Sequence, residues 1–368
     1  MPFRRTERQH LNRDVGAFGG LHHVSQLFSH HLGTAENLAE GRFTEYDDVF
    51  RRIRCVQDLP AAEPTTRASR VSLGNGPMME PTGLEQPGHY VHMWSIYRSV
   101  RDREAIEGWC LDRLDAWPVE HERRKITAGG HSTHLVLAGS GDRTAVFVPG
   151  TNFNAASCSP FATALSERFR LVMADVPGQP GLSGENRPPA AQRASWYRRW
   201  LGDVLDHIDG EQVVLIGHSL GAAVVLTWDS PRVSQQVLLS PGGLVRARLG
   251  PGILVPAVAW MLRRSPRTSE RLLATMHAPG NSPRAELVDW MTLVARHVRT
   301  SLDPNAAPPP TRTVDRVIVA GEHDRYYPPR ALADRVRDVL GQELTAFPRS
   351  GHLLIDERPE AIADLLAG

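Results

Sequence analysis

Strand-like and helix-like patterns of hydrophobic residues alternate along most of the chain. β-Forming residues run between turn residues at positions 120–127, 131–137, 144–148, 170–174, 213–216, 236–239, 316–321 and 344–347. Apolar residues recur at helical spacing at positions 96–117, 161–169, 196–208, 222–226, 332–340 and 359–366. This alternation predicts an α/β fold, a mostly parallel central sheet with helices on both faces, in which antiparallel hairpins occur only at the start.

The alternation stops between residues 244 and 309. Three helical patterns occupy this segment, at residues 253–262, 269–276 and 285–298, and it contains no strand pattern. Ligands of open α/β sheets bind at the carboxyl ends of the strands, so an all-helical insertion between two strands is expected to cover that edge. The sequence therefore predicts a helical lid at residues 244–309, inserted into a core made of residues 96–243 and 310–368.

Residues 1–95 have no sustained hydrophobic period and predict a partly irregular N-terminal extension. Short helices are expected only at residues 35–38 and 46–53, and residues 60–88 are rich in proline, glycine, serine and threonine. The pairs His22-His23 and His30-His31 would share one face of a helix. No carboxylate or cysteine accompanies them in a regular spacing, so solvent-exposed histidines are the simpler interpretation and no metal site is predicted.

Composition restricts the possible partners. The 42 Lys and Arg residues nearly balance the 41 Asp and Glu residues, which gives no electrostatic reason to expect nucleic acid or an anionic membrane as a partner. The three cysteines, Cys55, Cys110 and Cys158, form no CxxC pair and indicate neither a disulfide framework nor a cysteine metal site. We find no signal-peptide pattern, and the longest apolar stretch, residues 253–262, is too short to span a membrane. We expect a cytoplasmic protein and predict no oligomeric state.

The clearest chemical signal is Gly217-His218-Ser219-Leu220-Gly221, between a buried strand and a helix. A serine in such a strand–turn–helix context is typical of a nucleophile elbow, in which the two glycines remove clashes that a Cβ would cause. A serine that merely caps the helix is the alternative reading of the motif taken alone.

A serine hydroxyl needs a general base, and the base needs a carboxylate to orient it. His352 follows the last predicted strand in Ser350-Gly351-His352, and Asp324 follows the strand at residues 316–321. Glu322 is the rival carboxylate, but it lies close to the strand end. His277 and His297 fall in the helical insertion and are expected to be surface or lid residues.

Two backbone N–H groups would have to bind the developing oxyanion. The first is that of Leu220, directly after the serine. The second is assigned to Thr151 in Pro149-Gly150-Thr151, with Asn152 as the fallback, because proline carries no N–H group.

From about residue 100 onward the chain resembles the α/β-hydrolase superfamily, and bacterial carboxylesterase-like members in particular. The segments Gly217–Gly221, Gly321-Glu322-His323-Asp324 and Ser350-Gly351-His352 are similar to the three catalytic segments of the family, in the same order. Residues 175–183, Asp-Val-Pro-Gly-Gln-Pro-Gly-Leu-Ser, resemble the family's loop after the fourth strand. One departure concerns the oxyanion loop, where the family usually has His-Gly and this chain has Pro149-Gly150.

The resemblance implies serine-dependent hydrolysis of an ester or related acyl bond of a small molecule, without a metal or cofactor. C–C bond hydrolases, thioesterases, lactonases and perhydrolases share the same catalytic residues, so these activities remain open alternatives. A non-catalytic ligand-binding homologue is a further alternative, although none of the three catalytic positions is missing.

Overall fold

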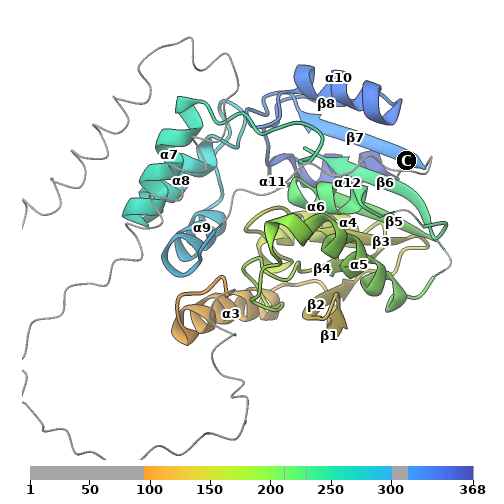
Figure 1. Cartoon of the computed structure of the whole chain (residues 1–368), viewed down its shortest axis with the longest axis horizontal. Helices are drawn as coiled ribbons and strands as arrows, with labels where there is room; N and C mark the ends of the chain where they lie inside the picture. Colours follow the sequence, from red (N-terminus) through yellow and green to blue (C-terminus); the bar gives the residue numbers. More distant parts are fainter. Residues whose placement is uncertain (1–94, 211, 229, 301–313, 368) are drawn as a thin grey trace, which may run out of the picture. The chain divides into compact units, whose positions relative to one another are not determined.

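The computed structural model describes residues 95–210, 212–228, 230–300 and 314–367. The described residues contain an eight-stranded sheet with the order β1-β2-β4-β3-β5-β6-β7-β8 (Figure 1). Its strands are β1 (His121–Ala128), β2 (His131–Ala138), β3 (Thr144–Val148), β4 (Arg170–Ala174), β5 (Val213–His218), β6 (Val233–Leu239), β7 (Asp315–Gly321) and β8 (Thr345–Phe347).

Strand pairing puts the carboxyl ends of the later strands at one edge of the sheet. β1 pairs with β2, and β2 with β4, in antiparallel fashion. The pairs β3–β4, β3–β5, β5–β6, β6–β7 and β7–β8 are all parallel. The predicted mostly parallel sheet with an antiparallel start is confirmed, and the loops after β3, β5 and β7 share one edge.

Helices cover both faces of the sheet. Apart from those between β6 and β7, the helices of the described residues are α3 (Val100–Asp115), α4 (Ser159–Ser166), α5 (Arg193–Asp206), α6 (Leu220–Leu226), α10 (Pro329–Leu340), α11 (Leu354–Glu357) and α12 (Pro359–Ala367), with two short 3-10 turns, η2 (Ala156–Cys158) and η3 (Ala190–Gln192). Successive residues of β3 show why two cores form: Phe147 packs with α4 and α12, whereas Val146 packs with α5 and α6. A strand directs alternate side chains to opposite faces, so a continuous apolar strand supplies both layers.

The described residues between β6 and β7 form three helices, near the three helical patterns of the sequence: α7 (Pro251–Arg263), α8 (Pro266–Ala274) and α9 (Ala285–His297). The indole N–H of Trp260 in α7 donates to the carbonyl oxygen of Met291 in α9 at 2.9 Å. In turn, the hydroxyl of Thr292 in α9 donates to that of Ser269 in α8 at 2.8 Å. These buried bonds fasten the three helices to one another. None of the helices in the described part of the chain is both long and apolar enough to cross a bilayer.

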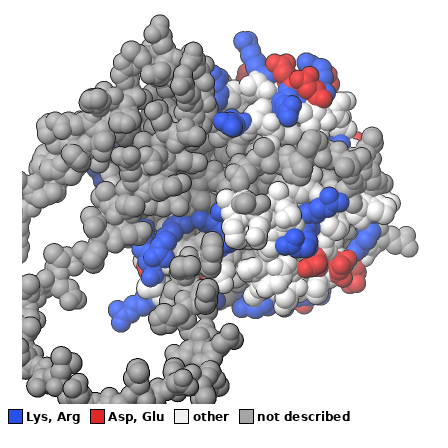
Figure 2. Space-filling view, viewed as in Figure 1, with Lys and Arg blue, Asp and Glu red and all other residues white. Residues whose placement is uncertain are grey.

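Most predicted elements are found within a few residues of their expected positions. Helix α11 and the two 3-10 turns were not predicted, because segments of three or four residues are too short to show a helical period. The helices expected at residues 35–38 and 46–53, and the histidine pairs beside them, lie outside the described residues. Figure 2 shows basic and acidic side chains next to each other on the described part of one face, in keeping with the small net charge of the chain.

Candidate active site

Ser219 occupies the tight turn between β5 and α6. Its backbone has φ 52° and ψ −109°, a conformation that residues with a Cβ rarely adopt. A Cβ at Gly217 would lie 2.4 Å from the carbonyl carbon of Gly221, and one at Gly221 would lie 1.9 Å from the carbonyl oxygen of Val148. Both positions therefore require glycine, for the steric reason that the motif suggested.

The structure brings Ser219, His352 and Asp324 together past the carboxyl ends of β5, β8 and β7. The hydroxyl Oγ of Ser219 lies 3.1 Å from Nε2 of His352. Nδ1 of the same imidazole lies 2.9 Å from Oδ2 of Asp324. All three residues are buried. An ionised carboxylate only accepts hydrogen bonds, so Nδ1 carries the proton and Nε2 is left to accept the hydroxyl proton of the serine.

The carboxylate of Asp324 is held in place by backbone groups. Its Oδ1 accepts the N–H groups of Tyr326 at 2.8 Å and Tyr327 at 2.9 Å, which leaves Oδ2 for the imidazole. Both tyrosine rings pack beside His352, with ring centroids at 5.1 and 5.5 Å. Burial raises the pKa of Tyr326 to about 12 and also raises the pKa of Tyr327, so both phenols stay neutral next to the imidazole.

The loop that carries His352 is fastened to the connection between α8 and α9. The N–H of Gly351 donates to Oε2 of Glu357 at 2.6 Å, and Oε1 of the same carboxylate accepts the N–H of Ala278 at 2.7 Å. On the other side of the histidine, the N–H of Leu353 donates to the carbonyl oxygen of Met276 at 3.1 Å. The bonds to the carboxylate of Glu357 are charge-assisted and therefore strong. The backbone that carries the imidazole of His352 is thus restrained.

His218, directly before the serine, is completely enclosed and supports the same loop. Its Nε2–H donates to the carbonyl oxygen of His352 at 2.9 Å, and within the described structure its Nδ1 has no hydrogen-bond partner. Burial, and after it the nearby imidazole of His352, lowers the pKa of His218 to about 3. A neutral His218 adds no positive charge beside an imidazole that would have to become protonated during catalysis.

We expect the lowered pKa of His218 to appear in the pH dependence of the free energy of unfolding. Between pH 6.5 and about 3 this histidine is protonated in the unfolded chain and neutral in the folded protein. Its contribution to the free energy of unfolding is therefore fully present above pH 6.5 and is lost as the pH falls toward 3. In His218→Gln, a non-titrating amide can still donate to the carbonyl oxygen of His352. Its melting temperature should therefore fall less than that of the wild type between pH 7 and 4. Replacing the exposed His207 with glutamine is the control, and parallel profiles for all three proteins would contradict the expectation.

The two predicted oxyanion donors lie on two segments that meet at the serine. Leu220 is the first residue of α6, and Thr151 lies in the loop after β3. An added Cβ on Gly150 of that loop would be only 3.3 Å from Cβ of Ser219, so the two loops are in close contact. The fallback donor, the N–H of Asn152, is already bonded to Oε1 of Gln179 at 2.9 Å.

Three further sequence candidates lie elsewhere. Glu322 is exposed and its carboxylate accepts the N–H of Arg349 at 3.3 Å. His277, expected to be a surface or lid residue, lies in the helical insertion and is not at the surface: it is 4% exposed, and its Nε2 lies 3.7 Å from Oδ2 of Asp356, an ion-pair distance that is too long for a hydrogen bond. His297 is partly buried and pairs with a carboxylate of α3.

Gln179 and Glu357, beside the site, carried no sequence signal of their own. The side chain of each accepts a backbone N–H of a loop that holds a candidate residue. The indole of Trp290 also binds one of these loops. Gln179 lies within the quoted loop at residues 175–183, but a buried amide with a backbone partner has no motif of its own.

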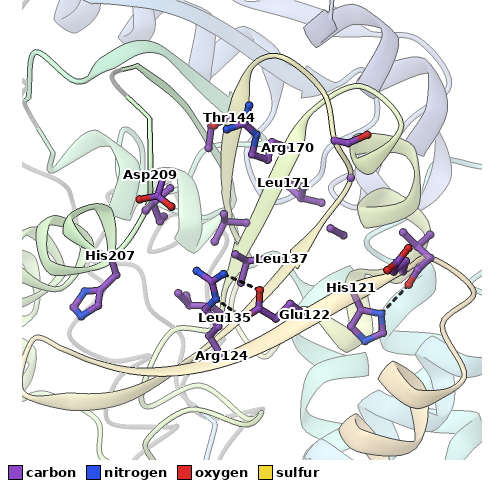
Figure 3. A pocket seen from close by; sticks show the side chains of 17 residues that line it. His121, Glu122, Arg124, Leu135, Leu137, Thr144, Arg170, Leu171, His207 and Asp209 are labelled. Carbon is purple, nitrogen blue, oxygen red and sulfur yellow. Dashed lines mark hydrogen bonds and ion pairs between the residues drawn. The ribbon is translucent and has the colours of Figure 1, made fainter.

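No group of three or more histidine, cysteine, aspartate or glutamate residues in the described ranges is arranged to hold a metal ion. A hollow of about 650 Å³ does occur in the described part, beside β1, β2 and the end of α5 (Figure 3). Its lining includes Thr144 and Arg170, the first residues of β3 and β4, and the ion pair of Glu122 with Arg124. It therefore lies at the amino ends of the parallel strands, the edge opposite Ser219.

Comparison with known proteins decides the family. The sequence model of the alpha/beta hydrolase family matches residues 145–365. The chain belongs to the alpha/beta hydrolase family. The uncharacterised hydrolase YugF of Bacillus subtilis is 25% identical over 268 residues, which cover 66% of this chain and 96% of that protein. The protein is thus an enzyme of the hydrolase class, as the sequence predicted.

Solved structures with the same fold include two enzymes of Bacillus subtilis. Carboxylesterase CesB superimposes with a TM-score of 0.59 at 21% identity, over 73% of this chain and 97% of that chain. Naproxen esterase superimposes with a TM-score of 0.59 at 21% identity, over 70% of this chain and 94% of that chain. At this level of identity the superpositions show the alpha/beta hydrolase fold, and that prediction is confirmed.

Proposed function

We propose that the protein hydrolyses carboxylic esters of small molecules, with Ser219 as nucleophile, His352 as general base and acid, and Asp324 as the group that orients the imidazole. The observation that carries this proposal is the unbroken line of hydrogen bonds from Oγ of Ser219 through the imidazole to Oδ2 of Asp324, at 3.1 and 2.9 Å. The similarity in fold to carboxylesterase CesB and naproxen esterase supports an ester as the substrate.

In the acylation step, Oγ of Ser219 attacks the ester carbonyl carbon while Nε2 of His352 takes the hydroxyl proton. Asp324 stabilises the imidazolium that forms, and the N–H groups of Leu220 and Thr151 bind the oxyanion. The intermediate collapses, the C–O bond to the alcohol breaks, and the imidazolium gives its proton to the leaving alcohol. Water then attacks the acyl-serine with the same histidine as base, which releases the carboxylic acid and restores the serine.

We further propose that the helical insertion, residues 244–309, acts as a lid over this site, within a core made of residues 96–243 and 310–368. Two contacts of its described part support this placement. The indole of Trp290 donates to the carbonyl oxygen of Asn152 at 2.8 Å, and the carbonyl oxygen of Met276 accepts the N–H of Leu353 at 3.1 Å. The insertion thus touches loops on both sides of Ser219.

The acyl-enzyme intermediate can be tested by measuring how it partitions between methanol and water. Phenyl butyrate and p-nitrophenyl butyrate carry the same acyl group, so both should give one common butyryl-Ser219 intermediate. In water containing methanol, we expect the ratio of methyl butyrate to butyrate to be the same for both esters, because the leaving group has departed before the acceptor is chosen. Product ratios that differ between the two esters, or the absence of turnover, would contradict the proposal.

A further inference from the structure

The loop after β3 presses directly against the nucleophile. Its residues 150–153 form a turn that is closed by the N–H of Phe153 donating to the carbonyl oxygen of Gly150 at 3.1 Å. Asn152, the third residue of the turn, has φ 64°, the left-handed value that a type II turn requires and that asparagine tolerates. A Cβ on Gly150 would meet Nδ1 of His218 at 2.9 Å and Cβ of Ser219 at 3.3 Å, so the turn has no room to move closer.

The residue directly before this turn has no polar side chain. The family usually has His-Gly at this place, whereas this chain has Pro149-Gly150. Proline has neither an N–H nor a polar side chain, so its side chain cannot fix the turn by hydrogen bonding. Polar side chains of other segments bind the turn.

Three segments bind the next residue of the turn, Asn152. Oε1 of Gln179, in the loop after β4, accepts its N–H at 2.9 Å. The indole N–H of Trp290, in α9, donates to its carbonyl oxygen at 2.8 Å. The hydroxyl of Thr300 donates to its side-chain oxygen at 2.8 Å.

Gln179 and Trp290 are themselves firmly held. Gln179 is 3% exposed and Trp290 is completely buried. The loop after β4 is joined to the loop after β3 at further points, since the side chain of Asn154 donates to the carbonyl oxygen of Pro180 at 3.0 Å. The amide of Gln179 is thus presented from a rigid support.

We propose that Gln179 is a positioning residue that holds the oxyanion loop in its working conformation, with the indole of Trp290 as the second support. The inference rests on the proposed function, because it assigns the N–H of Thr151 to the oxyanion. The bonds to the N–H and the carbonyl oxygen of Asn152 hold the loop directly after Thr151, and a shift of this loop would carry the N–H of Thr151 out of alignment. Neither Gln179 nor Trp290 needs to touch the reacting atoms.

Such a role predicts a selective effect on the transition state. Charge develops on the carbonyl oxygen mainly in the transition state, so a misplaced donor lowers kcat and leaves KM nearly unchanged. Removal of one oxyanion donor costs about 100- to 1,000-fold in kcat, and a misaligned donor should cost less, about 10- to 100-fold. Binding of a trifluoromethyl ketone, whose serine adduct carries the same oxyanion, should weaken by the same factor.

The test compares Gln179→Met with a matched control, Gln236→Met, in the full-length chain. Both glutamines are buried, and the amide of Gln236 donates to backbone carbonyl oxygens of Val225 and Trp228, away from the serine. Loss of a buried polar contact should lower the melting temperature of both variants. Only Gln179→Met should also lose kcat on p-nitrophenyl acetate and affinity for the trifluoromethyl ketone.

A second pair keeps the test decisive if Gln179→Met folds poorly. Trp290→Phe removes the indole donor to the oxyanion loop, and Trp260→Phe removes a comparable buried donor whose acceptor is the carbonyl oxygen of Met291 within the insertion. We expect Trp290→Phe to weaken trifluoromethyl ketone binding about 3- to 30-fold and Trp260→Phe to leave it unchanged. Equal kinetics and ketone affinity within each pair would overturn the positioning role, provided that the wild type turns over the ester and binds the ketone. A wild type that does neither would instead overturn the proposed function.

Discussion

Ser219→Ala is expected to lower kcat for ester hydrolysis by about four to six orders of magnitude while the protein stays folded. The hydroxyl oxygen is the only non-hydrogen atom lost, and it is the atom that would form the acyl-enzyme. Nothing in the turn depends on it for geometry, because the strained backbone at φ 52° is fixed by the close approach of β3, β5 and α6 rather than by the side chain. The melting temperature should therefore change little.

Ser240→Ala is the matched control for this experiment. Ser240 directly follows the neighbouring strand β6 and also has a positive φ, 42°; in the described structure its buried hydroxyl has no hydrogen-bond partner. Removal of an unsatisfied buried hydroxyl should leave stability unchanged or raise it, and kcat should stay within about threefold of the wild type. Steady-state rates on p-nitrophenyl esters check both variants. A Ser219→Ala protein that retained a tenth of the wild-type rate would contradict the role of the serine.

Asp324→Asn should lower kcat by about 10,000-fold through the tautomer of His352. The N–H groups of Tyr326 and Tyr327 both need an acceptor, so the amide oxygen of the asparagine takes the place of Oδ1. The amide nitrogen then faces Nδ1 of the imidazole, and since both cannot donate, the proton of the imidazole moves to Nε2. In that tautomer Nε2 has no lone pair to accept the proton of Ser219.

Glu322→Gln provides the comparison, because this carboxylate is two residues away and exposed. We expect its kcat to stay within about threefold of the wild type, since its contacts are with the backbone of Arg349 and with His323, and not with the imidazole of His352. The pH dependence of kcat adds a second readout: the Asp324→Asn protein should recover rate at high pH, where hydroxide can replace the missing base. A large loss in Glu322→Gln together with a small loss in Asp324→Asn would exchange the roles of the two carboxylates.

Local patterns were sufficient to predict the strands and the serine. β3 and β5 are short apolar runs between turn residues, and their limits depend on neighbours in the sequence. The Gly-x-Ser-x-Gly motif likewise encodes a steric requirement of its own turn. Asp324 and His352 could be proposed as its partners because each follows a predicted strand, and parallel strands present their carboxyl ends at one edge.

Contacts between distant segments could not be predicted from the sequence. Nothing in the pattern places β4 between β2 and β3, since strand order depends on packing of the whole sheet. Asn152 is 27 residues from Gln179 and 138 residues from Trp290, and both contacts involve backbone atoms that every residue possesses. The burial of His277 could not be predicted for the same reason, because its charged neighbour Asp356 comes from α11.

The most direct test of the proposed catalytic group is covalent labelling by a fluorophosphonate, followed by peptide mapping. A serine hydroxyl activated by His352 attacks the phosphorus and expels fluoride, so the probe mass should appear once, on the peptide that contains Ser219, in the wild type and in Ser240→Ala. It should be absent from Ser219→Ala and strongly reduced in Asp324→Asn. An unlabelled wild type, or a label on any residue other than Ser219, would contradict the account.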